Sequence, residues 1–251
     1  MRFNCDKYLG KVFTSNKCGD FTVIDYQNSD NVTVKFLKTG YVTTIQAYHI
    51  KDGAIKDRMH PSVYGVGVLG EAQASDNGKK LPEYRVWRGL LARCYNSKTK
   101  LKTPSYDGCT VSDNFKHYSY FKDWCSSQIG FGEVGWELDK DILVRGNKVY
   151  SENTCVFVPK EVNLLLLTAK GIRGTHPIGV AFHKRSGSYR ATISEYDKQV
   201  HLGSYASSED AFNAYKVAKE AYVKEVANKW KDKVDVRVYE ALMNYQVEIT
   251  D

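Results

Sequence analysis

The sequence lacks any apolar run long enough to cross a membrane. The longest run, residues 162–167, has Asn163 inside it, whereas a transmembrane helix needs about 20 apolar residues. The N-terminal residues MRFNCDKYLGKVF also lack the apolar core of a secretory signal. We therefore expect a cytoplasmic protein with no membrane contact.

The six cysteines form no metal or redox motif. They are dispersed from Cys5 to Cys155, without a Cys-x-x-Cys pair and without a Cys/His cluster at zinc-finger spacing. An even number is compatible with a disulfide framework, but the missing signal favours buried free thiols. We expect no metal site and no cofactor.

The composition excludes a disordered chain, because 42% of the 251 residues are hydrophobic and 13% aromatic. Lys and Arg number 36 against 29 Asp and Glu, a formal net charge of +7. This excess favours polyanions, and it is spread as +3 over residues 1–70, +3 over 71–170 and +1 over 171–251. Any phosphate contact must therefore come from folded surfaces, not from a basic tail.

The first segment has the pattern of a small antiparallel barrel. Short β-branched and aromatic runs at residues 11–13, 21–26, 32–36 and 41–45 are separated by turn residues. We predict an SH3-like β-barrel over residues 1–70, which is a candidate surface for a protein partner. The glycines and polar residues that follow, up to Lys80, suggest a linker.

The next segment opens with a helical pattern. Its apolar face consists of Trp87, Leu90, Leu91 and Cys94. Arg85, Arg88 and Arg93 lie mostly off this face, where they meet either phosphates or only solvent. An aromatic stretch over residues 115–124 is expected to pack on this helix.

The C-terminal segment predicts a three-stranded sheet with one helix across it. Residues 178–182, 189–194 and 199–203 are short strands joined by tight turns. Ser207 is expected to cap the helix, with the acidic Asp210 at its third position. The residues after Trp230 are expected to add a short helix and a closing strand.

Strand periodicity assigns the side chains of this sheet to two faces. The residues expected to face the helix are Val180, Phe182, Tyr189, Ala191, Ile193, Val200 and Leu202. The residues expected on the open face are Ala181, His183, Arg190, Thr192, Ser194, Gln199 and His201. Such a face can enter the major groove, where Arg pairs with guanine and Gln with adenine. The alternative is an ordinary solvated sheet face.

Four linked motifs in residues 177–215 resemble those of AP2 DNA-binding domains. They are Gly-Val before a basic stretch, Tyr-x-Ala-x-Ile, Leu-Gly-x-Tyr, and Glu-Asp-Ala-x-x-Ala-Tyr, in the family's order and spacing. The resemblance implies an AP2 domain over residues 171–251 that binds double-stranded DNA through its sheet. The base contacts that the resemblance implies fall on Ala181, His183, Arg190, Thr192, Ser194 and His201. The other residues predicted to bind DNA are Arg173, Lys184, Arg185 and Gln199. Because Ala181 and His201 stand where Arg and Trp are usual in plants, the site must differ from the plant one.

Residues 138–163 resemble the core of HNH nucleases, which commonly precedes an AP2 domain in phage proteins. The alignment places Asn153 at the family's central Asn and Asn163 at its last position, where a helix residue binds the metal ion. Asp139 matches the Asp of the family's Asp-His pair. Lys140 stands where the general-base His is expected. The resemblance implies an HNH-like ββα core within residues 71–170 and a relation to phage homing endonucleases, which are mobile elements. It also implies that the protein is associated with DNA in the cytoplasm of a bacterial host cell.

Lys140 changes the expected chemistry. HNH cleavage needs a neutral imidazole that accepts a proton from water while Mg²⁺ stabilises the reacting phosphate. Lysine has an ordinary pKa of about 10 and is protonated at neutral pH unless desolvation lowers that pKa. His117, His176 and His183 lie outside the motif. The alternative is an unusual variant in which Asp139 and Asp141 hold a metal and a carboxylate is the base.

If cleavage is lost, Lys140, Arg145 and Lys148 would add sequence-independent phosphate contacts while the AP2-like sheet specifies the site. The alternative for Arg145 and Lys148 is a solvated turn.

The sequence thus predicts an α+β protein of three parts that binds a specific duplex DNA site without being an enzyme, most simply as a transcriptional repressor. The rival is an active homing or nicking endonuclease that needs Mg²⁺. Both a monomer and a homodimer are compatible with the sequence.

Overall fold

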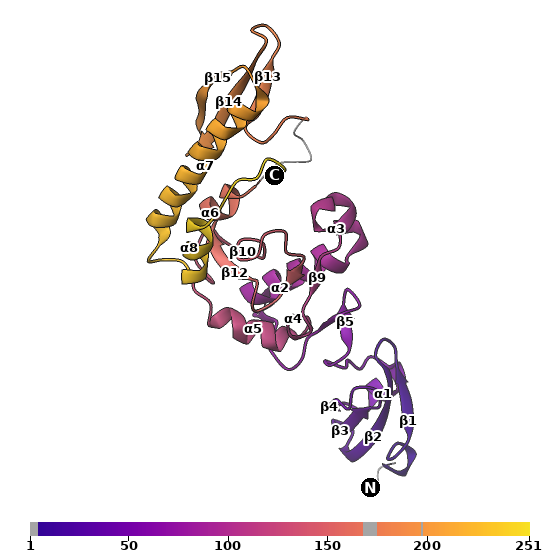
Figure 1. Ribbon diagram of the computed structural model, residues 1–251. Coiled ribbons are helices and arrows are strands. Elements are labelled where there is room, and N and C mark those ends of the chain that lie inside the picture. Colours follow the sequence, from indigo (N-terminus) through magenta and orange to yellow (C-terminus); the bar gives the residue numbers. More distant parts are fainter. Residues whose placement is uncertain (1–4, 168–174, 197) are drawn as a thin grey trace. The chain divides into compact units, whose positions relative to one another are not determined.

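The computed structural model describes residues 5–167, 175–196 and 198–251 (Figure 1). The chain forms two compact units, Met1–Cys125 and Ser126–Asp251. Helices alternate with small antiparallel sheets, which confirms the predicted α+β class. In the described ranges no helix has the length and apolar character that crossing a bilayer requires.

The first unit begins with a four-stranded antiparallel sheet in the order β1-β2-β3-β4. Its strands are β1 (Val12–Ser15), β2 (Gly19–Asn28), β3 (Asn31–Phe36) and β4 (Val42–Ile45). These strands coincide with the four predicted runs, and their alternate residues Phe21, Val23, Val32, Val34 and Phe36 are fully buried. The period-two pattern therefore identified the strands correctly.

The predicted closure into a barrel is wrong for the described residues, because β1 and β4 remain the edges of the sheet. After β4 the chain turns into helix α1 (Tyr48–Asp52), and the residues that follow meet only the end of β1, where Ser15 Oγ donates to the carbonyl oxygen of Ile55 at 2.7 Å. Ile50 of this helix and Ile55 beyond it pack in the same core as the strands. A helix and a loop thus cover the core that a closed barrel would enclose.

The residues of the predicted linker include short paired strands. Residues 61–80 form two short antiparallel pairs, β5 (Pro61–Val63) with β6 (Gly67–Val68) and β7 (Ser75–Asp76) with β8 (Lys79–Lys80). A Cβ on Gly67 would lie 2.5 Å from Leu91 Cδ1. Glycine at this position allows close packing and does not mark a flexible connection.

The predicted helix is α2 (Pro82–Tyr95), and its apolar face is confirmed. Trp87, Leu90, Leu91 and Cys94 are all fully buried. Trp87 Nε1 donates to the carbonyl oxygen of Phe115 at 2.7 Å, so the aromatic stretch packs on α2 as predicted. The other elements of this unit are η1 (Cys5–Lys7), α3 (Ser97–Lys102), η2 (Pro104–Tyr106), β9 (Thr110–Val111), α4 (Asp113–Lys116) and α5 (Tyr118–Ser126).

The second unit contains a ββα arrangement and a sheet-and-helix arrangement. The first consists of β10 (Trp136–Asp139), paired antiparallel with β12 (Val156–Pro159), and α6 (Lys160–Leu165). The second consists of β13 (Val180–His183), β14 (Ser188–Glu195), β15 (Lys198–Tyr205) and α7 (Ser208–Trp230). Strand β11 (Val149–Tyr150) and helix α8 (Val236–Met243) complete this unit.

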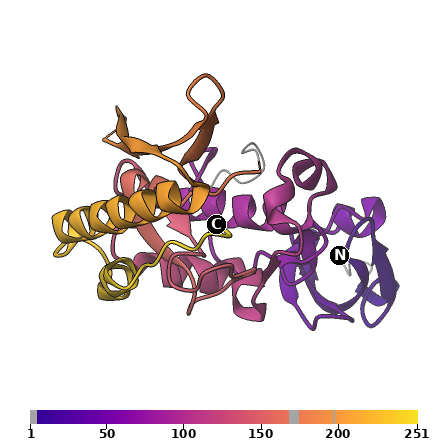
Figure 2. The same ribbon diagram turned by 45° about the horizontal axis from the view of Figure 1, so that its top comes forward.

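One hydrophobic core joins the two arrangements of the second unit. Val158 and Val162 of the ββα part belong to the same buried cluster as Ala191 of the sheet and Val223 of α7. Helix α7 is long enough to reach both, running from beneath the three-stranded sheet to α8 (Figure 2). The ββα part and the sheet-and-helix part therefore share one core. The domain boundaries predicted at residues 70 and 170 stay predictions.

The predicted closing strand is absent from residues 244–251. Val247 is nevertheless buried, because α7 side chains bind its backbone. Its N–H donates to Glu220 at 2.9 Å, and its carbonyl oxygen accepts from Lys216 Nζ at 2.6 Å. Side chains here satisfy the backbone groups that a strand ladder would have paired.

Candidate nucleic-acid interface

The sheet β13-β14-β15 presents one face to helix α7 and leaves the other open. Ala191 and Ile193 of the central strand are 0% and 2% exposed and share a core with Tyr215 of α7. Arg190 and Ser194, their neighbours in sequence, are exposed. The predicted sidedness of β14 is confirmed.

Strand pairing places polar residues in rows across the open face. These rows are Ala181–Arg190–Ser204, His183–Ser188, Thr192–His201 and Ser194–Gln199. Arg190 occupies the middle strand of its row, which gives its guanidinium small neighbours on both sides, a methyl group and a hydroxyl. The open face therefore offers hydrogen-bonding groups at regular strand spacing around one arginine.

A bulge in β15 shapes the outer edge of this face. Ala191 pairs with Gly203 and Thr192 with His201, so Leu202 is the additional residue. His201 and Ser204 consequently share the open face although they are three residues apart. Leu202 packs against the core, as predicted.

Two residues predicted to face the helix are only partly covered. Phe182 and Val200 are 43% and 38% exposed, although they pair with Tyr189 and Ile193 of the helix-facing set. The rings of Phe182 and Tyr189 lie 5.1 Å apart. Periodicity gave the correct side, but the extent of burial depends on how far α7 covers the sheet.

The turn between β13 and β14 adds two exposed cations, Lys184 and Arg185. Hydrogen bonds order this turn, because the Ser186 hydroxyl contacts His183 Nδ1 at 2.8 Å and the Ser188 hydroxyl at 2.7 Å. The engaged Nδ1 leaves Nε2 as the imidazole nitrogen that can meet a ligand.

The open face carries positive charge without acidic neighbours. Residues 175–194 contain three basic and no acidic residues. Glu195 follows Ser194 and therefore points to the helix side, where its charge acts on Lys219. Burial is the larger influence on Lys219 and lowers its pKa. Among the described residues of the open face none is acidic, so the face favours a polyanion.

Close packing and a capped helix hold the sheet in place. A Cβ on Gly179, which has φ of +75°, would lie 2.0 Å from the Tyr215 ring, so only glycine lets β13 approach α7. The Ser207 hydroxyl accepts from Asp210 N at 3.0 Å, which confirms the predicted cap.

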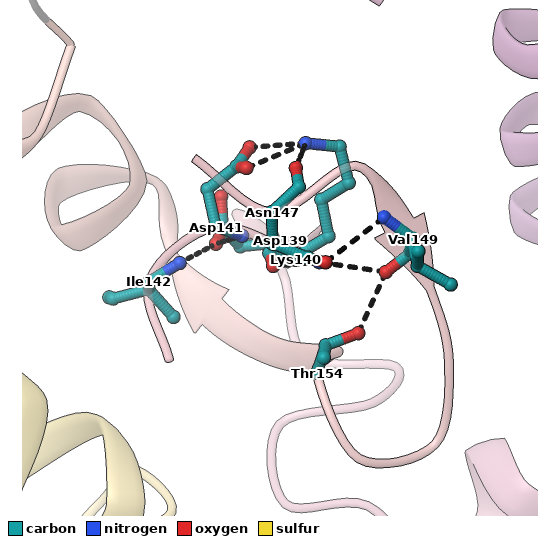
Figure 3. A network of polar contacts seen from close by, with 7 residues as sticks. All are labelled: Asp139, Lys140, Asp141, Ile142, Asn147, Val149 and Thr154. Carbon is teal, nitrogen blue, oxygen red and sulfur yellow. Dashed lines mark hydrogen bonds and ion pairs between the residues drawn. The ribbon is translucent and has the colours of Figure 1, made fainter. Parts of the chain in front are cut away.

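The predicted nuclease residues lie in the ββα part, where Lys140 is the centre of a polar network (Figure 3). Lys140 is only 5% exposed. Its Nζ contacts the two carboxylate oxygens of Asp141 at 2.6 and 2.7 Å and donates to the carbonyl oxygen of Asn147 at 2.7 Å. Lys140 therefore holds its own loop together and does not present its charge to a phosphate track.

The Asp139 carboxylate also accepts hydrogen bonds within this loop. Its Oδ1 accepts from the backbone N–H groups of Asp141 and Ile142, both at 2.7 Å. Burial raises the pKa of Asp139, and these two hydrogen bonds oppose the effect only in part.

Asn147, which the sequence analysis did not single out, organises this loop. Its side-chain amide donates to the carbonyl oxygens of Lys140 and Val149, both at 2.7 Å, and its Oδ1 accepts from Val149 N at 3.0 Å. The Gly146-Asn147 pair is a turn signal that could have indicated it.

Among the described contacts, neither of the two predicted asparagines forms a hydrogen bond within this network. Asn163 on α6 donates to Glu137 Oε2 at 2.5 Å. Asn153 is exposed in the turn that precedes β12. No described contact joins either one to Asp139.

These residues do not fit a divalent-cation site. The Asp141 carboxylate is bound to an ammonium group, and the Asn163 amide is bound to Glu137. Across the described residues, no three His, Cys, Asp or Glu side chains gather as metal ligands would. Cys18, Cys94, Cys109, Cys125 and Cys155 are buried thiols, as predicted for the cysteines. Burial raises the pKa of Cys155 to about 12.

Three further residues were predicted to contact phosphates, Arg145, Lys148 and Arg173. Arg145 forms an ion pair with Asp251, donates to the carbonyl oxygen of Gln246 at 3.0 Å and lies over the Tyr245 ring. It therefore anchors the C-terminal residues. Lys148 is exposed, and Arg173 lies outside the described residues.

Comparison with protein-family models, with curated proteins and with solved structures gave no match for this chain. The AP2-like and HNH-like assignments therefore rest on sequence motifs.

Proposed function

We propose that this protein binds a specific site on double-stranded DNA through the open face of the β13-β14-β15 sheet, as an AP2-like domain would. The observation that carries the proposal is the acid-free polar face, with Arg190 central and Thr192, Ser194, Gln199 and His201 around it. Arg and Gln can each pair in a bidentate way with one base in the major groove. Lys184 and Arg185 in the adjoining turn supply phosphate contacts that orient the sheet.

We further propose that the chain does not cleave DNA. The residue at the general-base position is a lysine whose Nζ is buried against Asp141 and the Asn147 carbonyl oxygen. An ammonium group that donates hydrogen bonds in this way has no lone pair with which to take a proton from water.

The test is a combined retention and cleavage assay. The full chain is incubated with a fragmented phage-derived DNA library, once with EDTA and once with Mg²⁺ or Mn²⁺, and both the bound fragments and any new ends are sequenced. We expect selective retention of fragments that share a motif, with no new ends in metal. Defined new ends near the bound site would instead establish the rival function, an active endonuclease.

A specific binder without cleavage has a simple use as a transcriptional repressor, which is the biological role we propose. At saturating occupancy of a promoter that contains the selected motif, transcription from that promoter should fall. Unchanged promoter output at that occupancy would refute the repressor role and leave the binding function intact.

A further inference from the structure

A second, more basic surface lies in the first unit. Residues 79–102, which we call the α2–α3 basic segment, contain eight basic residues and one acidic residue. The excess of +7 equals the formal net charge of the whole chain, so the other residues together are neutral. The positive charge of this protein is thus concentrated in one segment.

The fold exposes these cations because the apolar residues of α2 occupy its other face. Arg85 and Arg88 lie one turn apart on α2 and are exposed, as are Lys98 and Lys102 on α3. Asn96 ends α2 and also caps α3 by accepting from Thr99 N at 3.0 Å. Only Asn96 separates the two helices. The exposed cations of α2 are therefore followed directly by those of α3.

Five cations of this segment are not neutralised by any described acidic residue. Within the described ranges, no ion pair involves Arg85, Arg88, Lys98, Lys100 or Lys102, whereas Lys116, Lys140 and Lys229 all form one. Tyrosine rings lie beside three cations of the segment. The Arg88 guanidinium is 5.8 Å from the Tyr64 centroid, Lys80 Nζ is 4.9 Å from the Tyr84 centroid, and the Arg93 guanidinium is 5.3 Å from the Tyr106 centroid. A ring of this kind orients a cation and leaves its charge intact.

We propose that the α2–α3 basic segment is a second DNA-binding surface, which contacts the phosphate backbone without reading sequence. This inference rests on the proposed function, in which the open face of the β13-β14-β15 sheet, without acidic groups among its described residues, binds duplex DNA. Several unpaired cations on consecutive helices are suited to a row of phosphates.

The test compares full-length variants on duplex DNA over a range of salt concentrations. R85A/R88A/K98A/K102A should weaken binding to unrelated duplexes by on the order of 100-fold at low salt. Each lost phosphate contact should reduce the slope of log K against log salt by about 0.9. The ratio of specific to non-specific affinity should stay unchanged, because phosphate contacts carry no base information.

Two control variants make the result specific. K11A/K35A/K38A/K51A removes four exposed lysines from the same unit and should leave a clearly larger slope. R85K/R88K/K98R/K102R keeps every charge and should restore binding to unrelated duplexes. An unchanged unfolding midpoint and an unchanged tryptophan emission spectrum show that each variant is folded.

The inference is overturned if the quadruple α2–α3 variant and its lysine control show the same affinity and slope. Failure of the proposed function gives a different result. In that case the wild-type chain prefers no sequence, while the α2–α3 variant still loses slope.

Discussion

Arg190 is the residue on which the proposed recognition depends most. It is exposed, lies in the middle strand, and pairs across the sheet with the small residues Ala181 and Ser204. A guanidinium group in such surroundings keeps its fork of donors available for a guanine edge. Lysine carries the same charge but lacks this fork. Replacing Arg190 by lysine therefore separates the contribution of the charge from that of the guanidinium geometry.

We expect Arg190→Ala to reduce discrimination between the selected site and unrelated DNA by about 1–3 kcal/mol, roughly 5- to 150-fold. Arg190→Lys should lose similar discrimination while keeping most of the affinity for unrelated DNA. Competition binding measures both quantities. Equal discrimination by the wild type and both variants would exclude Arg190 from base contact.

Lys140 is expected to matter for stability. Lys140→Met leaves the Asp141 carboxylate and the Asn147 carbonyl oxygen without their donor. The loss should be about 2 kcal/mol in the free energy of unfolding, less than for a fully buried pair because the Asp141 side chain is 50% exposed. Urea unfolding measures it, with the exposed Lys224→Met as control, for which a change within about 0.5 kcal/mol is expected. Equal effects of the two substitutions would contradict the role assigned to Lys140.

At the scale of elements, patterns with strong periodicity could be predicted and side-chain networks could not. The strands of both sheets, the apolar face of α2 and the Ser207 cap follow from local sequence. The bulge at Leu202 and the open edge of the first sheet depend on how strands meet in space. The Asn147 network likewise depends on contacts between residues that no periodicity links.

The junction of β13 and α7 gives a test of packing at this scale. Gly179→Ala places a Cβ against the Tyr215 ring, whereas Gly187→Ala, also at positive φ, finds no atom within 4 Å. We expect a loss of about 1 kcal/mol for Gly187→Ala, from backbone strain, and at least about 2 kcal/mol for Gly179→Ala. Thermal unfolding of both variants measures the difference. If Gly187→Ala loses as much stability as Gly179→Ala, crowding against Tyr215 does not contribute to the loss.

The contact between α6 and α7 should make stability depend on pH. Burial alone would raise the pKa of Glu161, but hydrogen bonds from Lys229 and Trp230, at 2.8 and 2.7 Å, lower it overall. A lowered pKa in the folded state stabilises the protein above the unfolded pKa, and this contribution is lost as pH falls through the folded pKa. Glu161→Gln should therefore be less stable than the wild type at neutral pH.

This difference should shrink as acid protonates Glu161 in the wild type. Urea unfolding between pH 7 and pH 3 measures it, with Glu240→Gln, at an exposed position, as the control. A deficit that stays constant over the whole range would show that the charge of Glu161 does not contribute.

At the scale of the whole molecule, the second unit combines the candidate DNA-reading sheet with the ββα part in one core. The ββα part therefore has a structural role that does not depend on catalysis. It packs against α7, and α7 in turn supports the sheet. The charge of the chain is concentrated elsewhere, in the α2–α3 basic segment. Recognition and non-specific affinity are thus assigned to different units.

Cooperative unfolding of the second unit follows from its shared core. Val223→Ala on α7 removes fully buried methyl groups and should speed hydrogen exchange in both β12 and β14. Val34→Ala, in the separate core of the first sheet, should leave both strands unchanged. Faster exchange in β14 alone after Val223→Ala would indicate two independent parts.

The most direct test of the central claim is selection from a randomised duplex library by the wild-type chain, Arg190→Ala and Gln199→Ala. If the open face reads bases, the wild type selects one motif, and each variant loses preference at a different position of that motif while keeping the others. Selection of the same motif by all three proteins, or of no motif by the wild type, would contradict the claim that this sheet recognises DNA.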